Sequence, residues 1–206
     1  AAGLDPDCSL CASGVALSLG PTLNTGITPA DTVLARKAAD RALELARPDD
    51  ARARGLASAL KVRYAVDAPV GGREKAFGRA LDEAFKANPR DDMLASLAAH
   101  ALIIPARQDD YSGVPRAVEI LETVLARSPD DTAAIHYFIH ATEFAGRAPM
   151  ALSYADRLAD LAPGSGHLVH MGTHTQMRVG HYRDVALSNA RALKVDAQSQ
   201  PALPTS

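Results

Sequence analysis

Apolar residues recur along the chain with the periodicity of amphipathic helices, and prolines interrupt this pattern at regular intervals. Pro6, Pro48, Pro89, Pro129 and Pro163 follow one another at spacings of 42, 41, 40 and 34 residues. Proline marks the end of one helix, and the Asp or Ser residues just after it are suited to cap the next helix. The pattern predicts helices near residues 6–19, 30–46, 50–65, 73–87, 91–104, 114–127, 131–145, 148–161, 165–179 and 182–195.

The predicted helices fall into pairs, and the two helices of a pair are joined differently in the two halves of the chain. In the last two pairs the connection is a short turn that contains Gly146 or Gly180. In the earlier pairs extra residues separate the helices, at 20–29, 67–72 and 105–113. Loops accommodate such insertions without disturbing a stack of helices. The sequence therefore predicts an all-α array of about five helical hairpins.

The last two hairpins resemble the tetratricopeptide repeat. The final proline spacing of 34 residues equals the period of that family, and the segments are IHYFIHATEFAGRAPMALSYADRLADLAP and LVHMGTHTQMRVGHYRDVALSNARALKVD. Ala151 and the pair Val185-Ala186 occupy the small-residue position of the second helix. The chain departs from the family pattern at Ile135, which replaces a Trp, and at Ile139, which replaces a Gly.

This resemblance implies a right-handed superhelical array that forms a single repeat domain over residues 1–197, followed by a flexible Pro- and Ser-rich tail at 198–206. In tetratricopeptide arrays the first helix of each hairpin lines the concave groove where ligands bind. The earlier hairpins match the family pattern less closely than those after residue 113. The resemblance nevertheless covers nearly the whole chain.

Five of the seven histidines lie on the first helices of the last two hairpins. His136, His140 and Glu143 are spaced i, i+4, i+7, which places them on one helical face. The next first helix places three more histidines on one face, at i, i+3, i+7. They are His167, His170 and His174.

Counted from the preceding proline, these residues occupy equivalent registers in the two repeats. His136 and His170 are at +7, and His140 and His174 are at +11. Equivalent registers in stacked repeats are neighbours in space, so the side chains are predicted to form two adjacent columns. The resemblance implies that these columns lie on the ligand-contacting positions of the groove.

Neutral imidazole is the commonest metal ligand, and helices pack closely enough for side chains from two of them to share an ion. The predicted metal ligands are His136, His140, Glu143, His167, His170 and His174. They suit a transition metal ion such as copper, zinc or iron, as one ion with spare ligands or as two ions. With an open coordination position the ion could activate water, and Glu143 would serve as ligand or base.

The alternative is a repeat scaffold whose groove binds a peptide, protein or small molecule without catalysis, which is the usual role of such arrays. The sequence leaves the metal, the substrate and any enzymatic activity undecided, and it identifies no catalytic residue. His100, at +11 in the preceding repeat, is either a buried polar residue or a further ligand. His181 lies on the Gly180 turn and is expected to be exposed to solvent.

The only two cysteines, Cys8 and Cys11, have CxxC spacing at the start of a predicted helix. They could be redox-active, form a disulfide or provide half of a metal site. The segment DPDCSLCASGVALSLGP, together with HYFIHATE and GHLVHMGTH, resembles a bacterial subfamily of repeat proteins. That resemblance supplies no activity.

Net charge and hydropathy limit the possible partners. The formal charge is −2 and basic residues are interspersed with acidic ones, so no nucleic-acid partner is expected. No apolar stretch is long enough for a transmembrane segment. The start, Ala1-Ala2-Gly3-Leu4, lacks the features of a signal peptide and would follow a cleavage site or begin within a longer protein. We expect a soluble protein of the bacterial cytoplasm or periplasm.

Overall fold

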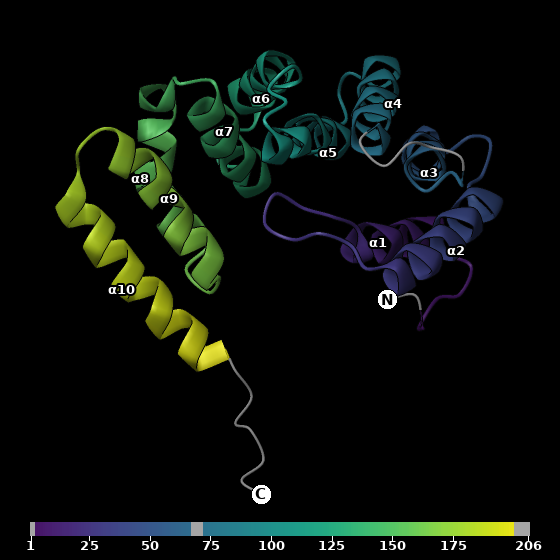
Figure 1. Ribbon diagram of the computed structural model, residues 1–206, viewed down its shortest axis with the longest axis horizontal. Helices are drawn as coiled ribbons and strands as arrows, with labels where there is room; N and C mark the ends of the chain where they lie inside the picture. Colours follow the sequence, from purple (N-terminus) through teal and green to yellow (C-terminus); the bar gives the residue numbers. More distant parts are fainter. Residues whose placement is uncertain (1–2, 67–71, 200–206) are drawn as a thin grey trace, which may run out of the picture. The chain divides into compact units, whose positions relative to one another are not determined.

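The computed structural model describes residues 3–66 and 72–199, and that part of the chain contains helices and no strands (Figure 1). The α-helices are α1 (Ser9–Leu19), α2 (Pro29–Leu45), α3 (Ala51–Arg63), α4 (Arg73–Ala87), α5 (Asp92–Ile103), α6 (Val114–Arg127), α7 (Thr132–Phe144), α8 (Leu152–Leu161), α9 (Gly166–Arg178) and α10 (Tyr182–Ser199). Two 3-10 turns precede α6 and α8, namely η1 (Ile104–Gln108) and η2 (Ala148–Ala151). The all-α array expected from the sequence is confirmed.

The observed helices match the predicted ranges closely in the middle of the chain and less closely at its ends. The first helix begins at Ser9 rather than at residue 6, because Cys8 serves as its N-cap. The last helix continues to Ser199 and so includes Gln198, which the sequence pattern placed in the tail. Residues 67–71 of the insertion predicted at 67–72 lie outside the described residues, as do the tail from residue 200 and Ala1 and Ala2.

The residues after the prolines cap the helices as expected. The side chains of Asp50, Asp91, Asp131 and Ser165 accept hydrogen bonds from the backbone N–H groups three residues further on, at 2.9, 3.1, 2.9 and 3.3 Å. Each cap satisfies a backbone donor that the first turn of a helix leaves without a partner. These four caps open α3, α5, α7 and α9, the first helices of the repeats.

The two glycine turns have the same backbone geometry. Gly146 and Gly180 adopt φ angles of 68° and 86°, in the left-handed region that favours glycine. The N–H of the residue after each glycine donates to a carbonyl five residues earlier, from Arg147 to Thr142 at 2.7 Å and from His181 to Gln176 at 2.9 Å. This closure ends α7 and α9 sharply and lets the following helix fold back.

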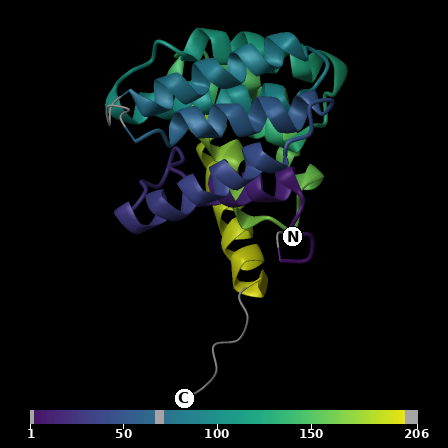
Figure 2. The same ribbon diagram turned by 90° about the vertical axis from the view of Figure 1, so that its right-hand side faces the viewer.

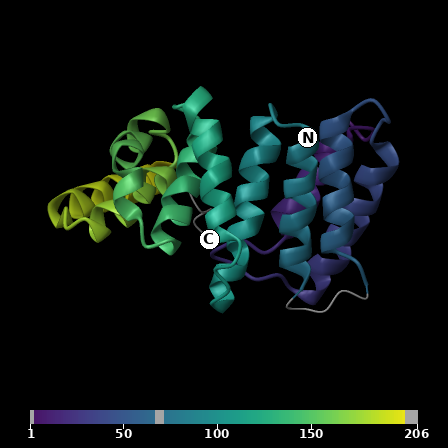
Figure 3. The same cartoon turned by 90° about the horizontal axis from the view of Figure 1, so that it is seen from above.

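The chain divides into two compact units, one up to Arg116 and one from Ala117 onwards. In the first unit α1 packs on α2, α2 on α3, α3 on α4 and α4 on α5. Figures 2 and 3 show α2, α3 and α4 side by side with their axes roughly aligned. Small residues allow this close approach at the α1–α2–α3 contact, where the buried side chains include Ala12, Ala42, Ala53 and Ala57.

A buried arginine of α3 links that helix to α4 in the first unit. The Arg63 side chain is 3% exposed and pairs with Glu74 at 2.7 Å. Its guanidinium also donates to the Pro21 carbonyl at 2.7 Å and lies 4.4 Å from the centre of the Phe77 ring. The neighbouring Tyr64 hydroxyl donates to the Ala16 carbonyl at 2.8 Å. These bonds connect α3 and α4 to α1 and to the segment that follows it.

In the second unit α7 packs against α8 and α9, and α9 packs against α8 and α10 (Figure 1). Its core contains Ile135, Ile139, Leu158 and Met171, all less than 2% exposed. Ile135 and Ile139 are the two positions where the sequence departs from the tetratricopeptide pattern, and both are filled by buried aliphatic side chains. The packing places α9 between α7 and α10, so that α9 presents one side to each.

The contact between α8 and α9 depends on Gly172. A Cβ atom at this position would lie 2.6 Å from the Ala155 carbonyl oxygen, which belongs to the backbone and cannot rotate away. We expect Gly172→Ala to destabilise the second unit by about 1–3 kcal/mol, although alanine is the better helix former. Chemical denaturation followed by circular dichroism measures the effect.

Gly14→Ala is the matched control for that substitution. Gly14 lies within α1, and no atom lies within 4 Å of the position where its Cβ would be. Here the helix propensity of alanine acts alone, and stability should rise by about 0.5–1 kcal/mol. Equal effects of the two substitutions would contradict the assigned role of Gly172.

Cys8 and Cys11 form a disulfide at the start of α1. The sequence left three alternatives open for these cysteines, and the structure shows the disulfide. In this oxidised form neither sulfur is a thiolate that could bind a metal ion. Among the described residues, no helix combines the length and the apolar character needed to cross a membrane.

Candidate metal centre

Five of the six predicted ligands contact the opposite helix where α7 and α9 pack against each other in the second unit, and His170 lies next to His174 with its Nδ1 toward Asn189 of α10. The N-cap of each helix sets the phase of its polar face, because Asp131 and Ser165 fix where the first turn begins. Residues four apart then follow each other along the same side of the helix. The α7 side chains are His136, His140 and Glu143, and those of α9 are His167, His170 and His174.

The five imidazoles form an unbroken series of ring contacts that crosses twice between the helices. Ring centres are 4.9 Å apart for His167 and His136, 5.1 Å for His136 and His140, 5.1 Å for His140 and His174, and 5.2 Å for His174 and His170. The two columns predicted from the repeat registers are therefore adjacent. Of the two equal-register pairs, His140 and His174 are in direct contact, as expected, whereas the ring contact of His136 with α9 is made by His167 at register +4.

His140, Glu143 and His174 form the tightest group of potential ligands. One ligand atom from each lies within 4.8 Å of those of the other two, and in the described part of the chain this is the one group of three such side chains that close together. His140 is 6% exposed, while the other two are partly buried. The group thus combines two imidazoles and a carboxylate from two helices in a place sheltered from water.

His136 and His167 meet at the other end of the series. Their Nε2 atoms are 3.2 Å apart. Two imidazoles bound to one tetrahedral ion, with metal–nitrogen bonds of about 2.0–2.1 Å, have nitrogen atoms about 3.3 Å apart. The observed separation is therefore close to the one that a shared metal ion requires, and it is also compatible with a single hydrogen bond between the rings.

Hydrogen bonds to Nδ1 orient two of the imidazoles. His174 Nδ1 donates to Glu143 Oε2 at 2.9 Å, since a carboxylate can only accept. His170 Nδ1 lies 2.7 Å from the side-chain oxygen of Asn189 on α10, which likewise accepts. With the proton on Nδ1, the Nε2 lone pair of both rings is left to bind an ion. A second partner of this kind behind the ligand is typical of metal-binding histidines.

The pKa values of two groups in the site are shifted. Burial alone would raise the pKa of the Glu143 carboxyl, but hydrogen bonds and positive charge from His174 and Arg178 outweigh it and hold that pKa below its ordinary value. The pKa of His167 is lowered by burial and, to a smaller extent, by the neighbouring His170 and His174. The environment therefore favours an anionic carboxylate at Glu143 and a neutral imidazole at His167, the forms that bind metal.

Three further polar residues contribute to the site and were not identified from the sequence. Arg178 donates to Glu143 at 3.0 Å, and Asn189 holds His170. Asn189 and Asp196 line a hollow of about 370 Å³ beside His167 and His170. The i, i+7 spacing of Asn189 and Asp196 indicates from the sequence that both lie on one face of α10, but it does not indicate that this face is turned to α9.

The two remaining histidines lie outside this site. His100 belongs to α5 in the first unit, where burial and then the charge of Arg63 lower its pKa to about 4. That neutral, largely buried state matches the interpretation of His100 as a buried polar residue. His181 lies on the turn after α9 with its side chain 46% exposed, as expected.

Comparisons with known proteins identify the fold. No protein-family model and no curated protein sequence matches the chain. Among solved structures, "MamA MSR-1 C2" is 14% identical with a TM-score of 0.55 over 92% of this chain and 95% of that chain. "MamA RS-1 ArsTM double mutant" is 14% identical with a TM-score of 0.56, over 94% and 97%.

A third similar structure is titled "Crystal structure of YrrB: a TPR protein with an unusual peptide-binding site". It is 16% identical to this chain with a TM-score of 0.52, and the match covers 96% of this chain and 91% of that chain. At these identities the likeness concerns the fold. It shows that the chain has a helical repeat fold of the tetratricopeptide type, as the resemblance in the last two hairpins implied.

Proposed function

We propose that this chain, which has the tetratricopeptide-repeat fold, binds a transition metal ion between α7 and α9. The observation that carries the proposal is the convergence of His140, Glu143 and His174, whose ligand atoms lie within 4.8 Å of one another. The three side chains come from two helices in different repeats. A metal ion would therefore connect those repeats as well as occupy the site.

The donor set indicates which ions fit. Imidazole nitrogen with one carboxylate suits zinc, copper or iron, whereas magnesium and calcium prefer oxygen ligands. His136, His167 and His170 complete the ligand set or hold a second ion at the His136–His167 end. Glu143 has two roles available, as a direct ligand or as the acceptor that orients His174.

The chemistry of the site depends on how many ligands the ion takes. If all coordination positions are filled by side chains, the protein stores or transfers metal. If one stays open, the ion supplies a Lewis acid that activates water, and the adjacent hollow of about 370 Å³ provides room for a substrate beside His167 and His170. Asn189 then positions His170, and Arg178 keeps Glu143 ionised.

A second candidate function is peptide or protein binding without a metal. It is favoured by the likeness to YrrB, whose structure is described as having an unusual peptide-binding site. In that case the hollow beside α9 and α10 would accept a peptide, and the imidazoles would hydrogen bond to it. The metal proposal explains better why five histidines and a carboxylate are in mutual contact.

Metal analysis of the intact chain, purified without a histidine tag, separates the two candidates. We expect the protein, after exposure to Zn(II) or Cu(II) and gel filtration, to retain at least one equivalent of metal. His174→Ala should lower the retained metal by at least about tenfold, equivalent to 1.4 kcal/mol of binding free energy. His181→Ala, a histidine outside the site, is the matched control and should retain as much metal as the parent.

A further inference from the structure

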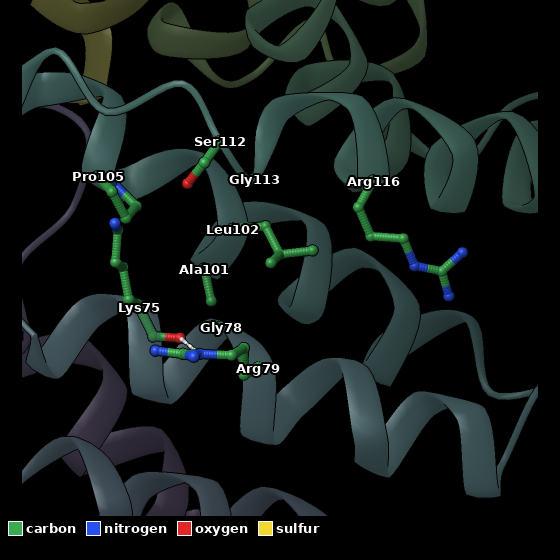
Figure 4. Close-up of a pocket in the computed structure, with 9 residues that line it drawn as sticks. All are labelled: Lys75, Gly78, Arg79, Ala101, Leu102, Pro105, Ser112, Gly113 and Arg116. Carbon is green, nitrogen blue, oxygen red and sulfur yellow. Dashed lines mark hydrogen bonds between the residues drawn. The ribbon is translucent and has the colours of Figure 1, made fainter.

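A second hollow lies in the first unit, between α4, α5 and the start of α6. Its volume is about 280 Å³, and Figure 4 shows the residues that line it. They are Lys75, Gly78, Arg79, Ala101, Leu102, Pro105, Ser112, Gly113 and Arg116. None of them belongs to the candidate metal centre, which lies in the other unit.

Two glycines of the lining allow the backbone to approach α5 closely. A Cβ atom on Gly113 would lie 2.3 Å from the Leu102 carbonyl oxygen, and one on Gly78 would lie 3.2 Å from the Ala101 backbone. The chain therefore passes closely over α5 at both places. The lining between them is apolar, and we call this part, which consists of Ala101, Leu102 and Pro105, the apolar floor of the hollow.

The charged residues of the lining are all positive: three of its nine residues are basic and none is acidic. Lys75 forms an ion pair with Asp110, and Arg116 pairs with Asp82 at 3.0 Å. Hydrogen bonds from Lys75 and Ser112 lower the pKa of Asp110 to about 2, so that this carboxylate stays ionised beside Lys75. Both acids lie outside the lining, and each neutralises one cation.

Arg79 supplies the excess positive charge. Its guanidinium donates to the Lys75 backbone carbonyl at 3.4 Å (Figure 4), and no carboxylate of the described residues lies within ion-pairing distance of it. In Figure 4 Lys75 and Arg79 lie close together on one side of Leu102, and Arg116 lies on the other side with its guanidinium pointing away from Leu102. A planar guanidinium presents paired donors that match a carboxylate.

We infer that this hollow binds a small organic acid, with its carboxylate at Arg79 and a short apolar stem against Leu102 and Pro105. The positive charge of Arg79 favours a ligand that carries a carboxylate. The apolar floor favours a ligand that carries a hydrocarbon stem over a simple inorganic anion, because burying the stem removes apolar surface from water.

Nuclear magnetic resonance titration of the full chain tests this inference with three probes: hexanoate, hexylammonium and inorganic phosphate. Hexanoate should shift the backbone amide signals of Gly78 and Gly113 in a saturable manner. Hexylammonium, which has the same stem and the opposite charge, should shift neither. Phosphate, which lacks the stem, should bind more weakly than hexanoate.

Two variants locate the binding site. Arg79→Gln should weaken hexanoate binding by at least about tenfold, because a charge-assisted hydrogen bond is lost. Ser112→Leu leaves every cation in place but fills the hollow, and it should weaken binding as well. The matched control is Arg54→Gln, which removes the same charge from an exposed position of α3 outside the lining.

The inference is overturned if hexylammonium shifts the same signals as hexanoate, or if Arg79→Gln binds hexanoate as tightly as the parent. It is also overturned if phosphate binds as tightly as hexanoate, because the apolar floor would then have no part in recognition.

Discussion

Adding Zn(II) or Cu(II) to the intact protein at pH 7.5 is expected to raise the melting temperature of the second unit by roughly 10–20 °C. An ion that binds only the folded state stabilises it by about 2.7 kcal/mol at a hundredfold excess over its dissociation constant. For a unit of this size, each kcal/mol corresponds to roughly 4–8 °C. Differential scanning calorimetry at several metal concentrations measures the shift.

The increment should disappear at acidic pH. Protons and metal compete for the same imidazole lone pairs, whose ordinary pKa is about 6.5. Several imidazoles must be neutral at once for an ion to bind, so lowering the pH from 7.5 to about 5 should remove the metal-dependent part of the melting temperature. Acid also lowers the stability of the metal-free protein, because the folded state lowers the pKa of His167. The metal-dependent increment is therefore the difference between the melting temperatures with and without metal at each pH.

Variants assign the increment to the site. His174→Ala should abolish it while leaving the helical circular dichroism signal unchanged, because alanine favours a helix and the His174 side chain is partly exposed. His136→Ala tests the other end of the imidazole series and should weaken the increment. His181→Ala should retain it in full. If His174→Ala responds to metal as the parent does, the site between α7 and α9 is wrong and the peptide-binding candidate is favoured.

Arg63→Ala is expected to destabilise the first unit by about 3–5 kcal/mol, the largest effect of any single substitution proposed for this protein. Removing one partner of a buried ion pair leaves the other charge without compensation. Here the substitution would leave the Glu74 carboxylate, which is 21% exposed, without its cationic partner. It would also remove the hydrogen bond to the Pro21 carbonyl and the contact with the Phe77 ring. Urea denaturation of the intact chain, with a probe in the first unit, measures the change.

Two comparisons separate the buried pair from the general effect of losing an arginine. Arg54→Ala, an exposed position on the same helix, should change stability by no more than about 0.5 kcal/mol. Replacing both partners, as Arg63→Met with Glu74→Leu, should cost less than Arg63→Ala alone, since no uncompensated charge is then left. A double variant that is less stable than the single one would contradict this explanation.

Most of the secondary structure and the residues of the candidate site could be predicted from the amino-acid pattern alone. Proline spacing and the capping residues after each proline located the helices, because both act within a few residues of the chain. Helical periodicity placed His136, His140 and Glu143 on one face, and the same rule grouped the three histidines of α9. Repeat register then predicted that the two groups would be neighbours, and the contact between His140 and His174 agrees with that prediction.

Contacts between residues far apart in the chain could not be predicted from the sequence and became visible only in the three-dimensional structure. The partners Asn189 and Arg178 and the burial of Arg63 against Glu74 depend on how particular helices pack, and no local pattern specifies that packing. The same holds for the hollow around Arg79, which exists because the backbone at Gly78 and Gly113 passes close to α5. Helical periodicity determines which side of a helix a residue occupies, but the packing of neighbouring helices determines which atoms that residue meets.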